Sequence, residues 1–258
     1  MAHLSAEIEV WGTVLYLEIA SPIDNQGALS AGIERVREFT THVDGVFSTY
    51  KENSTVSQLR RNEITIDQTS DEVRDVWRRC ESARYLTDGA FDPWAIEGGF
   101  DPSGLVKGWA ADRCAEILLA NGAVHVQVNA AGDISLRGGY LEGQSVSPWS
   151  IGVVNPEIRK EILQVFKITD GAIATSGTYE RGTHIFDPHS GLIAIGAKSA
   201  TVLGPDGAMA DALATALMVE GRDGAMWFSQ PELVQYSAWV IDRQEDIAWS
   251  VGPDIGQD

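Results

Sequence analysis

The 258-residue sequence predicts an α+β fold with mixed or antiparallel sheets and flanking helices. In several stretches, apolar residues recur at three- and four-residue steps, which is typical of amphipathic helices. Other stretches are short, rich in β-branched and aromatic residues and bounded by turn residues, which is typical of strands. The strands come in hairpin-like pairs between the helices, and this arrangement favours such sheets over a doubly wound parallel sheet.

The first predicted elements are a strand, a turn and a long helix. Residues 8–19 alternate in a strand-like way and predict a strand or one arm of a hairpin. Residues 24–27, Asp-Asn-Gln-Gly, form the turn. The helix that follows has an apolar stripe made of Ile33, Val36, Phe39, Val43 and Phe47. A polar stretch over residues 50–59 separates this helix from the next one.

Two further helices flank a loop of unusual composition. Ser70 is a candidate N-cap for a helix that extends to about residue 86 and has an acidic first turn, which the helix dipole favours. The loop over residues 87–104 combines large aromatic side chains with acids and glycines, as loops that line a ligand often do. A helix from about residue 105 to residue 121 ends at an Asn-Gly pair.

The second half of the chain is mostly strands, with one helix near the end. The helix covers residues 208–219 and stops at Gly221. The predicted strands are residues 124–129, 149–154, 163–168, 173–175, 199–203, 234–241 and 246–251.

The charge of the chain excludes some classes of ligand. Its formal net charge is −18, whereas a protein that binds nucleic acid needs a basic surface for the phosphates. The same charge argues against binding to an anionic membrane. An acidic protein that binds an anion must neutralise it locally, with a metal ion or with backbone N–H groups. The composition therefore favours a metal if the ligand is anionic.

A length of 258 residues suits one large domain or two interleaved small ones, and the sequence has no internal repeat or clear interdomain linker, so we expect one domain over residues 1–258. Cys80 and Cys114 lie at apolar helix positions without metal-ligand spacing, so we expect two buried, reduced thiols. The N-terminal residues have no basic and apolar signal pattern and no lipid-attachment cysteine. No window approaches the roughly 18 continuous apolar residues of a membrane span. We expect a cytoplasmic protein without a membrane anchor.

The stretch from His184 to Thr215 is the most informative for function. A histidine in a turn precedes a strand, and Asp211 and Thr215 then lie four residues apart on the predicted helix. Because positions i and i+4 share a helix face, these two side chains can direct oxygens to one point. Mg²⁺ prefers such oxygens, and Mn²⁺ or Ca²⁺ would fit them too. Taken alone, Asp211 would more often stabilise the helix start, and Thr215 would bond to the preceding turn.

Four segments of the chain form a recognisable set: residues 87–93 (Thr-Asp-Gly-Ala-Phe-Asp-Pro), 101–112 (Asp-Pro-Ser-Gly-Leu-Val-Lys-Gly-Trp-Ala-Ala-Asp), 174–179 (Ala-Thr-Ser-Gly-Thr-Tyr) and 184–215. In this order they resemble one family, the FAD:protein FMN transferases or ApbE family. Weaker similarities at residues 12–13, 50–62 and 129–132 extend the match over most of the chain.

The resemblance implies an activity and a set of site residues. Members split FAD at its pyrophosphate and join FMN to a Ser or Thr hydroxyl of an acceptor flavoprotein, releasing AMP. It implies Mg²⁺ held by the side chains of Asp211 and Thr215 and the carbonyl of Gly104, and His184 as the base. Histidine suits that role because its pKa is near neutral. The implied FAD contacts are Trp11, Tyr50, Ala90, Phe91, Asp92, Asp101, Lys107 and Ile185.

Within the implied FAD site, we assign particular residues to the flavin end and to a phosphate. Trp11 and Tyr50 would lie against the flavin end, where aromatic faces suit the rings. Residues Thr175, Ser176 and Gly177 are interpreted as a turn whose backbone N–H groups cradle phosphate.

The chain departs from the family pattern at two places. The family usually has an insertion of several tens of residues where only residues 94–100 stand here, so we expect a compact member with a shorter cleft wall. Pro102 and Ser103 replace a Leu-Gly pair, and Pro102 stiffens the turn. Three activities therefore stay open: transfer of FMN, hydrolysis of FAD to FMN and AMP, and FAD binding without catalysis.

Overall fold

The fold begins with a tight hairpin, in a computed structural model that describes residues 1–158, 160–178, 185–243 and 247–253. Strand β1 (Ala2–Val10) pairs antiparallel with β2 (Thr13–Ser21). Trp11 and Gly12 make the connection with φ angles of 56° and 69°. Two positive φ angles give the two-residue turn that matches the twist of a hairpin. A tryptophan with a positive φ is uncommon, and the direction of its side chain is set by the turn.

The hairpin forms one end of an eight-stranded sheet with the order β1-β2-β3-β4-β9-β10-β11-β12. Among the described residues every neighbouring pair in this sheet is antiparallel. Strand order follows chain order except where β5 to β8 leave the sheet, so most connections are short. The other strands are β3 (His125–Ala130), β4 (Asp133–Arg137), β9 (Gly171–Gly177), β10 (Ala197–Gly204), β11 (Ser237–Asp242) and β12 (Ala248–Val251).

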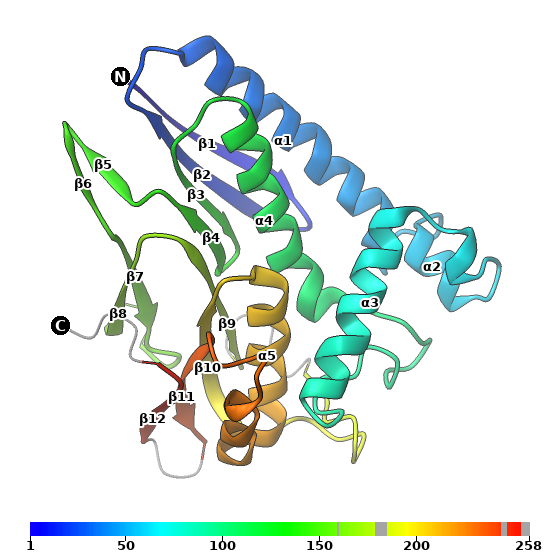
Figure 1. The fold of residues 1–258 in the computed structure, drawn as a ribbon. Helices are drawn as coiled ribbons and strands as arrows, with labels where there is room; N and C mark the ends of the chain where they lie inside the picture. The colour runs from blue at the N-terminus through cyan, green and yellow to red at the C-terminus, as the bar shows by residue number, and fades with distance from the viewer. Residues whose placement is uncertain (159, 179–184, 244–246, 254–258) are drawn as a thin grey trace.

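Helices cover one face of the sheet (Figure 1). These are α1 (Gln26–Phe47), α4 (Ser103–Ala120) and α5 (Gly207–Glu220), and α3 (Asp71–Leu86) packs on α4 and α5. The apolar stripe predicted for α1 faces inward, and α5 is apolar on nearly all sides because it lies between the sheet and other helices. This helical layer carries the residues of the candidate site.

A small hairpin covers part of the opposite face. It consists of β7 (Trp149–Val154) and β8 (Ile162–Ile168), next to the short pair β5 (Tyr140–Glu142) and β6 (Ser145–Ser147). Its apolar side chains pack against β4, β9 and β10 of the main sheet. Ile173 faces this hairpin while its neighbour Ala174 faces the helices, as alternation along a strand requires.

Each predicted helix and each predicted strand after residue 100 has a counterpart in the structure, with corrections at several ends. The single strand or hairpin arm predicted over residues 8–19 is wrong, because the turn at Trp11 and Gly12 divides this stretch between β1 and β2. The polar stretch 50–59 contains a short helix, α2 (Thr55–Arg60), capped by Ser54, whose Oγ accepts from the Ser57 N–H at 3.0 Å. Ser70 occupies the N-cap position of α3 but makes no side-chain cap bond. Strand β11 starts three residues later than predicted because turns continue to Tyr236 after the 3₁₀ helix η2 (Gly221–Ser229). A second 3₁₀ helix, η1 (Ile66–Gln68), precedes α3.

The predicted stop of α4 has a defined hydrogen-bond pattern. Gly122 has a φ of 89°, its N–H donates to the Leu119 carbonyl at 3.0 Å, and the Ala123 N–H donates to the Leu118 carbonyl at 3.1 Å. These two bonds form a Schellman motif, which glycine favours at this position. In the part of the chain that the structure describes, no helix combines the length and the apolar character needed to cross a membrane.

Candidate functional site

The candidate site lies where α4 and α5 approach most closely. Two glycines face each other there: a Cβ added to Gly108 would lie 2.0 Å from the Gly207 carbonyl oxygen. Only glycine lets the two backbones come this close. The adjacent side chains are thereby brought together, and the Lys107 ammonium lies 3.7 Å from Asp211 Oδ1.

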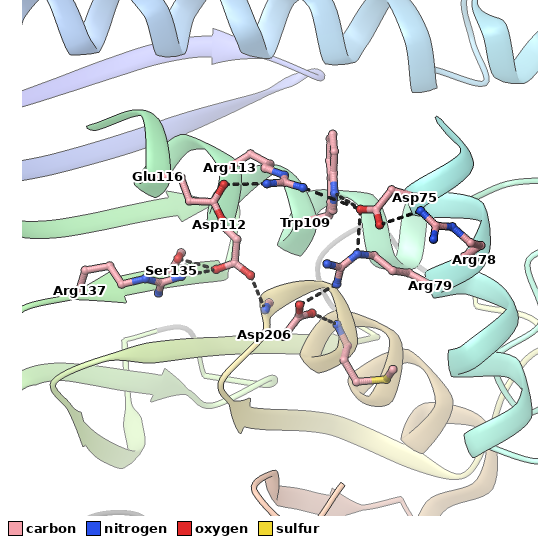
Figure 2. A network of polar contacts seen from close by, with 12 residues as sticks. Asp75, Arg78, Arg79, Trp109, Asp112, Arg113, Glu116, Ser135, Arg137 and Asp206 are labelled. Atoms are coloured by element: carbon pink, nitrogen blue, oxygen red, sulfur yellow. Dashed lines mark hydrogen bonds and ion pairs between the residues drawn. The ribbon is translucent and has the colours of Figure 1, made fainter. Parts of the chain in front are cut away.

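A network of charged groups fixes the start of α5 (Figure 2). Asp206 is its N-cap, and its Oδ1 accepts from the Met209 N–H at 2.9 Å. Arg79 of α3 donates to Asp206 at 2.7 Å and to Asp75 at 3.0 Å. The Trp109 indole N–H of α4 donates to Asp75 at 3.2 Å. Helices α3, α4 and α5 are therefore tied together one turn before Asp211.

Asp112 makes the second connection to the same helix end. Its Oδ2 accepts from the Gly207 N–H at 2.6 Å, and its Oδ1 accepts from Ser135 at 2.7 Å and Arg137 at 3.1 Å. Burial raises the pKa of the Asp112 carboxyl, against the lowering effect of the Ser135 hydroxyl and the Gly207 N–H. Asp112 thus links β4, α4 and α5, and its contacts are those of a residue that holds the site in shape.

Asp211 is the buried acid at the centre of the site. It is 2% exposed, and its Oδ2 accepts from the Gly108 N–H at 3.4 Å. In a helix that N–H points towards the carbonyl four residues earlier, which is the Gly104 carbonyl. The bond to Gly108 therefore turns the Asp211 carboxylate towards the side of α4 on which Gly104 lies.

Thr215 adds a hydroxyl oxygen near Gly104. A Cβ on Gly104 would lie 3.1 Å from Thr215 Oγ1 and 3.2 Å from the Phe91 ring. The backbone at Gly104 departs from helical geometry, with φ −84° and ψ 16°, which re-aims the first turn of α4. Ser176 Oγ of β9 lies 3.3 Å from Thr215 Oγ1. The structure thus brings Gly104, Thr215 and Ser176 together beside Phe91.

These oxygens suit a hard cation. The ligands expected from the sequence are a carboxylate, a hydroxyl and a backbone carbonyl, all oxygen, which is the donor set that Mg²⁺ prefers. Asp211 is nearly inaccessible to water, and Thr215 at position i+4 would supply the second oxygen. Among the described residues no cluster of three or more His, Cys, Asp or Glu side chains forms a separate metal centre. The chemistry of the donors therefore fits the expected ion.

A cavity of about 360 Å³ opens beside the first turns of α4. Trp11, Tyr50 and Lys107 line it together with Val106 and Phe47. The Trp11 indole N–H donates to the Thr40 carbonyl at 3.3 Å, which fixes the ring at the wall. Tyr50 is 94% exposed and stands at the rim.

Lys107 connects the two parts of the site. It lines the cavity, and its ammonium lies 3.7 Å from Asp211 Oδ1 on α5. Lys107 is thus the residue that the cavity and the oxygen cluster share.

The loop between α3 and α4 places three other candidates through its own hydrogen bonds. Ala90 and Phe91 are buried, and the Phe91 N–H donates to Thr87 Oγ1 at 3.1 Å. The Asp92 carboxylate accepts from Arg84 of α3 at 2.7 Å and from the Trp94 N–H at 2.9 Å. In this structure the Asp92 side chain therefore holds the loop.

Asp101 stands at the start of α4. Its Oδ1 accepts from the Ser103 N–H at 2.9 Å, and its Oδ2 lies 3.8 Å from Arg60 Nη1. Arg60 also donates to the Glu97 carbonyl at 2.7 Å and so braces the short segment 94–100. Asp101 precedes the N-cap Pro102 of α4 and contacts the loop, whereas Lys107 lies in α4 and contacts the sheet.

The interpretation of residues 175–177 as a turn is wrong. Thr175, Ser176 and Gly177 belong to β9 and pair with Thr201, Ala200 and Ser199 of β10. Thr175 Oγ1 contacts Thr201 Oγ1 at 3.0 Å. The Ser176 side chain, rather than a backbone cradle, is what this segment presents to Thr215. The pairing with β10 continues to Gly177, so the strand does not end at Thr175.

Two candidates come from the segment that follows. His184 lies outside the described residues. Ile185 is half-buried against the helical core, and its carbonyl accepts from the Ala194 N–H at 2.9 Å. Phe186 and Ile193 form an isolated antiparallel bridge, so the two ends of the loop between them lie side by side. The ring of His189 in this loop lies 3.4 Å from the Cβ that Gly89 would carry, which sets the loop beside residues 87–93.

Sequence reasoning missed one residue of the site, Asp133. It is 1% exposed, and its Oδ2 pairs with the Lys107 ammonium. The sequence signal for Asp133 was a strand followed by an Ala-Gly pair. In this structure the pair is a two-residue turn, and Asp133 is the first residue of β4. That turn marks a hairpin, but it does not reveal which helix residue the aspartate will meet.

The family model described as the ApbE family matches residues 95–238 of this chain. The chain is 35% identical over 156 residues to the FAD:protein FMN transferase of Vibrio cholerae, a match that covers 57% of this chain and 45% of that protein. It is 33% identical over 135 residues to the FAD:protein FMN transferase of Salmonella typhimurium, covering 48% of this chain and 38% of that protein. The chain thus spans less than half the length of these curated relatives.

Solved structures show the same fold. The ApbE protein of Thermotoga maritima matches with a TM-score of 0.83 and 23% identity, and 97% of each chain is covered. The flavin transferase ApbE of Vibrio cholerae matches with a TM-score of 0.79 and 24% identity, again over 97% of each chain. The predicted α+β fold of the flavin transferases is confirmed. Since the family model covers more than half of its residues, the chain belongs to the ApbE family.

Proposed function

We propose that this protein is a flavin transferase that splits FAD and attaches FMN to a Ser or Thr hydroxyl of an acceptor flavoprotein, releasing AMP. Curated relatives that carry the name FAD:protein FMN transferase support the substrate and the reaction. The observation that carries the proposal is the position of Lys107, which lines the aromatic cavity and contacts the buried acid Asp211. A long ligand with aromatic ends and a charged centre needs these two environments side by side.

Each residue has a proposed task in this reaction. Asp211, Thr215 and the Gly104 carbonyl would hold Mg²⁺, which when bound withdraws charge from the pyrophosphate oxygens. Lys107 and Asp101 would contact the FAD phosphates and the adjoining ribose region. Trp11 and Tyr50, at the wall and rim of the cavity, would flank a ring system. The further FAD contacts would come from Ala90, Phe91, Asp92, Thr175, Ser176, Gly177 and Ile185.

His184 would act as the base. It would take the proton from the acceptor hydroxyl, whose oxygen then forms the new bond to the phosphorus of the FMN moiety. The bond from that phosphorus to the bridging pyrophosphate oxygen breaks, and AMP leaves. A positioned base of this kind contributes about 10²–10⁴-fold to the rate, so loss of His184 should reduce turnover more than FAD binding.

One assay separates the possible activities. The purified protein is incubated with FAD, Mg²⁺ and a candidate acceptor domain, and AMP release and in-gel flavin fluorescence of the acceptor are followed. A fluorescent acceptor together with AMP supports transfer. AMP without a fluorescent acceptor would show hydrolysis by water, and retained FAD without AMP would show a binding protein. Either of the last two results contradicts the proposed reaction.

The metal site is tested by Asp211→Asn and Asp211→Ala. Removing a carboxylate that holds the cation should slow AMP release by on the order of 10²-fold or more, because the charge on the phosphoryl oxygens is no longer offset. Asp223→Ala is the matched control, since Asp223 is an exposed aspartate just beyond the same helix. Full activity in both Asp211 variants would show that the metal lies elsewhere.

A further inference from the structure

The buried acid Asp133 has no place in the reaction proposed above. It is 1% exposed, and its carboxylate pairs with the Lys107 ammonium. Burying a carboxylate is costly unless a partner compensates it, so its presence here calls for an explanation.

The backbone holds Asp133 in a rigid place. It is the first residue of β4 and pairs across the hairpin with Ala130, the last residue of β3. Only Ala131 and Gly132 connect the strands, with φ angles of 57° and 103°. The Gly132 N–H also donates to Asn129 Oδ1 at 2.9 Å, which stiffens the turn. A side chain at the start of such a turn has a well-defined position.

Lys107, by contrast, has a long and flexible side chain. It lies on α4, its side chain is 25% exposed, and it lines the cavity. Its ammonium lies near two buried carboxylates from different elements, Asp133 on β4 and Asp211 on α5. The contact with Asp133 is the closer of the two, and Asp211 Oδ1 is 3.7 Å away.

We propose that Asp133 is a positioning residue that anchors the Lys107 ammonium at the edge of the cavity and keeps it from closing onto Asp211. The inference rests on the proposed function, because it assigns Lys107 to a phosphate of FAD and Asp211 to the cation. Without the anchor, the attraction of Asp211 draws Lys107 away from the cavity. Lys107 then reaches the phosphate less well, and Asp211 holds a cation less well.

A double-mutant cycle measures this coupling. FAD affinity is determined by flavin fluorescence, without Mg²⁺ and in the presence of a chelator, for Asp133→Asn, Lys107→Met and the double variant. Each single change should weaken FAD binding by roughly tenfold or more, the size expected for a charge-assisted hydrogen bond to phosphate. In the Lys107→Met background, Asp133→Asn should then change the affinity by less than about twofold, because nothing is left to anchor.

Ser135→Ala provides the matched control. Ser135 lies two residues further along β4, is fully buried, and donates to Asp112 rather than to Lys107. Its effect on FAD affinity should be the same with and without Lys107. Asp133→Glu keeps the charge, so it should recover part of the affinity that Asp133→Asn loses. Additive effects of Asp133→Asn and Lys107→Met would overturn the inference.

Stability gives a second readout that does not depend on FAD. Lys107→Met leaves the buried Asp133 carboxylate without its closest ammonium, so the melting temperature should fall. Adding Asp133→Asn should raise the melting temperature of that variant again. A double variant that melts below Lys107→Met would show that Asp133 has a structural role of its own, and it would contradict the inference even if the single Asp133 variant fails to fold.

The two proposals fail in different ways. If the unaltered protein neither binds FAD nor releases AMP, the proposed function is wrong whatever the variants do. If it transfers FMN but Asp133 and Lys107 act independently, only the anchoring role is wrong. In active protein, Asp133→Asn should raise the FAD concentration needed for half-maximal rate more than it lowers kcat, whereas a loss of folded protein would lower kcat alone.

Discussion

At the scale of single residues, Thr215 offers a direct test of which hydroxyl holds the cation. Thr215→Val keeps the shape of the side chain and removes its oxygen. If Thr215 is a ligand, the Mg²⁺ concentration for half-maximal AMP release should rise by roughly tenfold or more, the loss expected when a metal site is weakened. The free energy of unfolding should change by only about 1 kcal/mol, the net worth of a typical hydrogen bond. Urea unfolding and a Mg²⁺ titration measure the two quantities.

Ser176→Ala is the control for that change. It removes the other hydroxyl of the contact at 3.3 Å and leaves Thr215 intact. If the hydrogen bond between the two hydroxyls were what matters, both variants would shift the Mg²⁺ titration equally. A shift with Thr215→Val alone identifies Thr215 as the ligand.

What the sequence reveals at this scale depends on how far apart the contacting residues lie. The pairing of Asp211 and Thr215 follows from helix geometry, because both lie on one face of one element. The contact of Lys107 with Asp133 joins residues on different elements, and nothing local predicts it. Asp92 shows the converse: it is a motif residue whose side chain, in this structure, accepts from Arg84 in the last turn of α3.

At the scale of elements, the crossing of α4 and α5 holds the site together. Gly108→Ala would put a Cβ 2.0 Å from the Gly207 carbonyl oxygen, so the helices must separate. Overpacking of this kind costs about 1–3 kcal/mol of unfolding free energy. Because Lys107 and Asp211 flank the crossing, FAD affinity should fall by more than the loss of folded protein explains. Urea unfolding and flavin fluorescence on the same samples separate the two effects.

Gly45→Ala is the matched control in another helix. Gly45 lies in α1, is exposed, and has no atom within 4 Å of the Cβ it would gain. The same substitution there should raise the unfolding free energy by about 0.5–1 kcal/mol, the difference in helix preference between alanine and glycine. If Gly108→Ala behaved like Gly45→Ala, the close crossing would have no structural importance.

The elements that the sequence predicts are those with long periodic patterns. Helices α1, α3, α4 and α5 each show an apolar pattern over several turns or clear end signals, and the structure has them within a few residues. Helix α2 has only six residues, too few for a periodic pattern to show, and it depends on the Ser54 cap. Strands β5 and β6 have three residues each and are largely exposed, so hydrophobic alternation carries no signal for them.

At the scale of the whole molecule, the order of the strands explains how distant motifs meet. Strands β4 and β9 are neighbours in the sheet although β5 to β8 separate them in the chain. Asp133 at the start of β4 and Ser176 near the end of β9 thereby face the same pair of helices. The sequence predicts strands and helices but not this order. The segment between β4 and β9 is long, so the sequence alone would also allow β4 to pair with other strands.

The buried thiols should make the stability of the whole molecule fall at high pH. Cys80 and Cys114 are fully buried, and burial raises the pKa of each thiol far above its usual value, with nearby acids adding to the effect at Cys80. In the unfolded chain the pKa of these thiols is about 8.5, so they ionise around that pH, whereas in the folded protein they stay protonated. Above that pH the unfolded state binds fewer protons, so stability decreases as pH rises.

Each thiol contributes about 1.4 kcal/mol per pH unit once the unfolded form is ionised, so the two should lower the unfolding free energy by about 2 kcal/mol between pH 9 and pH 10. Urea unfolding with a phosphine reductant, at pH 7.5, 9 and 10, measures this slope. The variant with both Cys80→Ala and Cys114→Ala will be less stable at every pH because of the space it leaves. Its stability should nevertheless decline less steeply above pH 9. An unchanged slope would mean that other groups, such as Tyr236, whose pKa burial also raises, cause the loss.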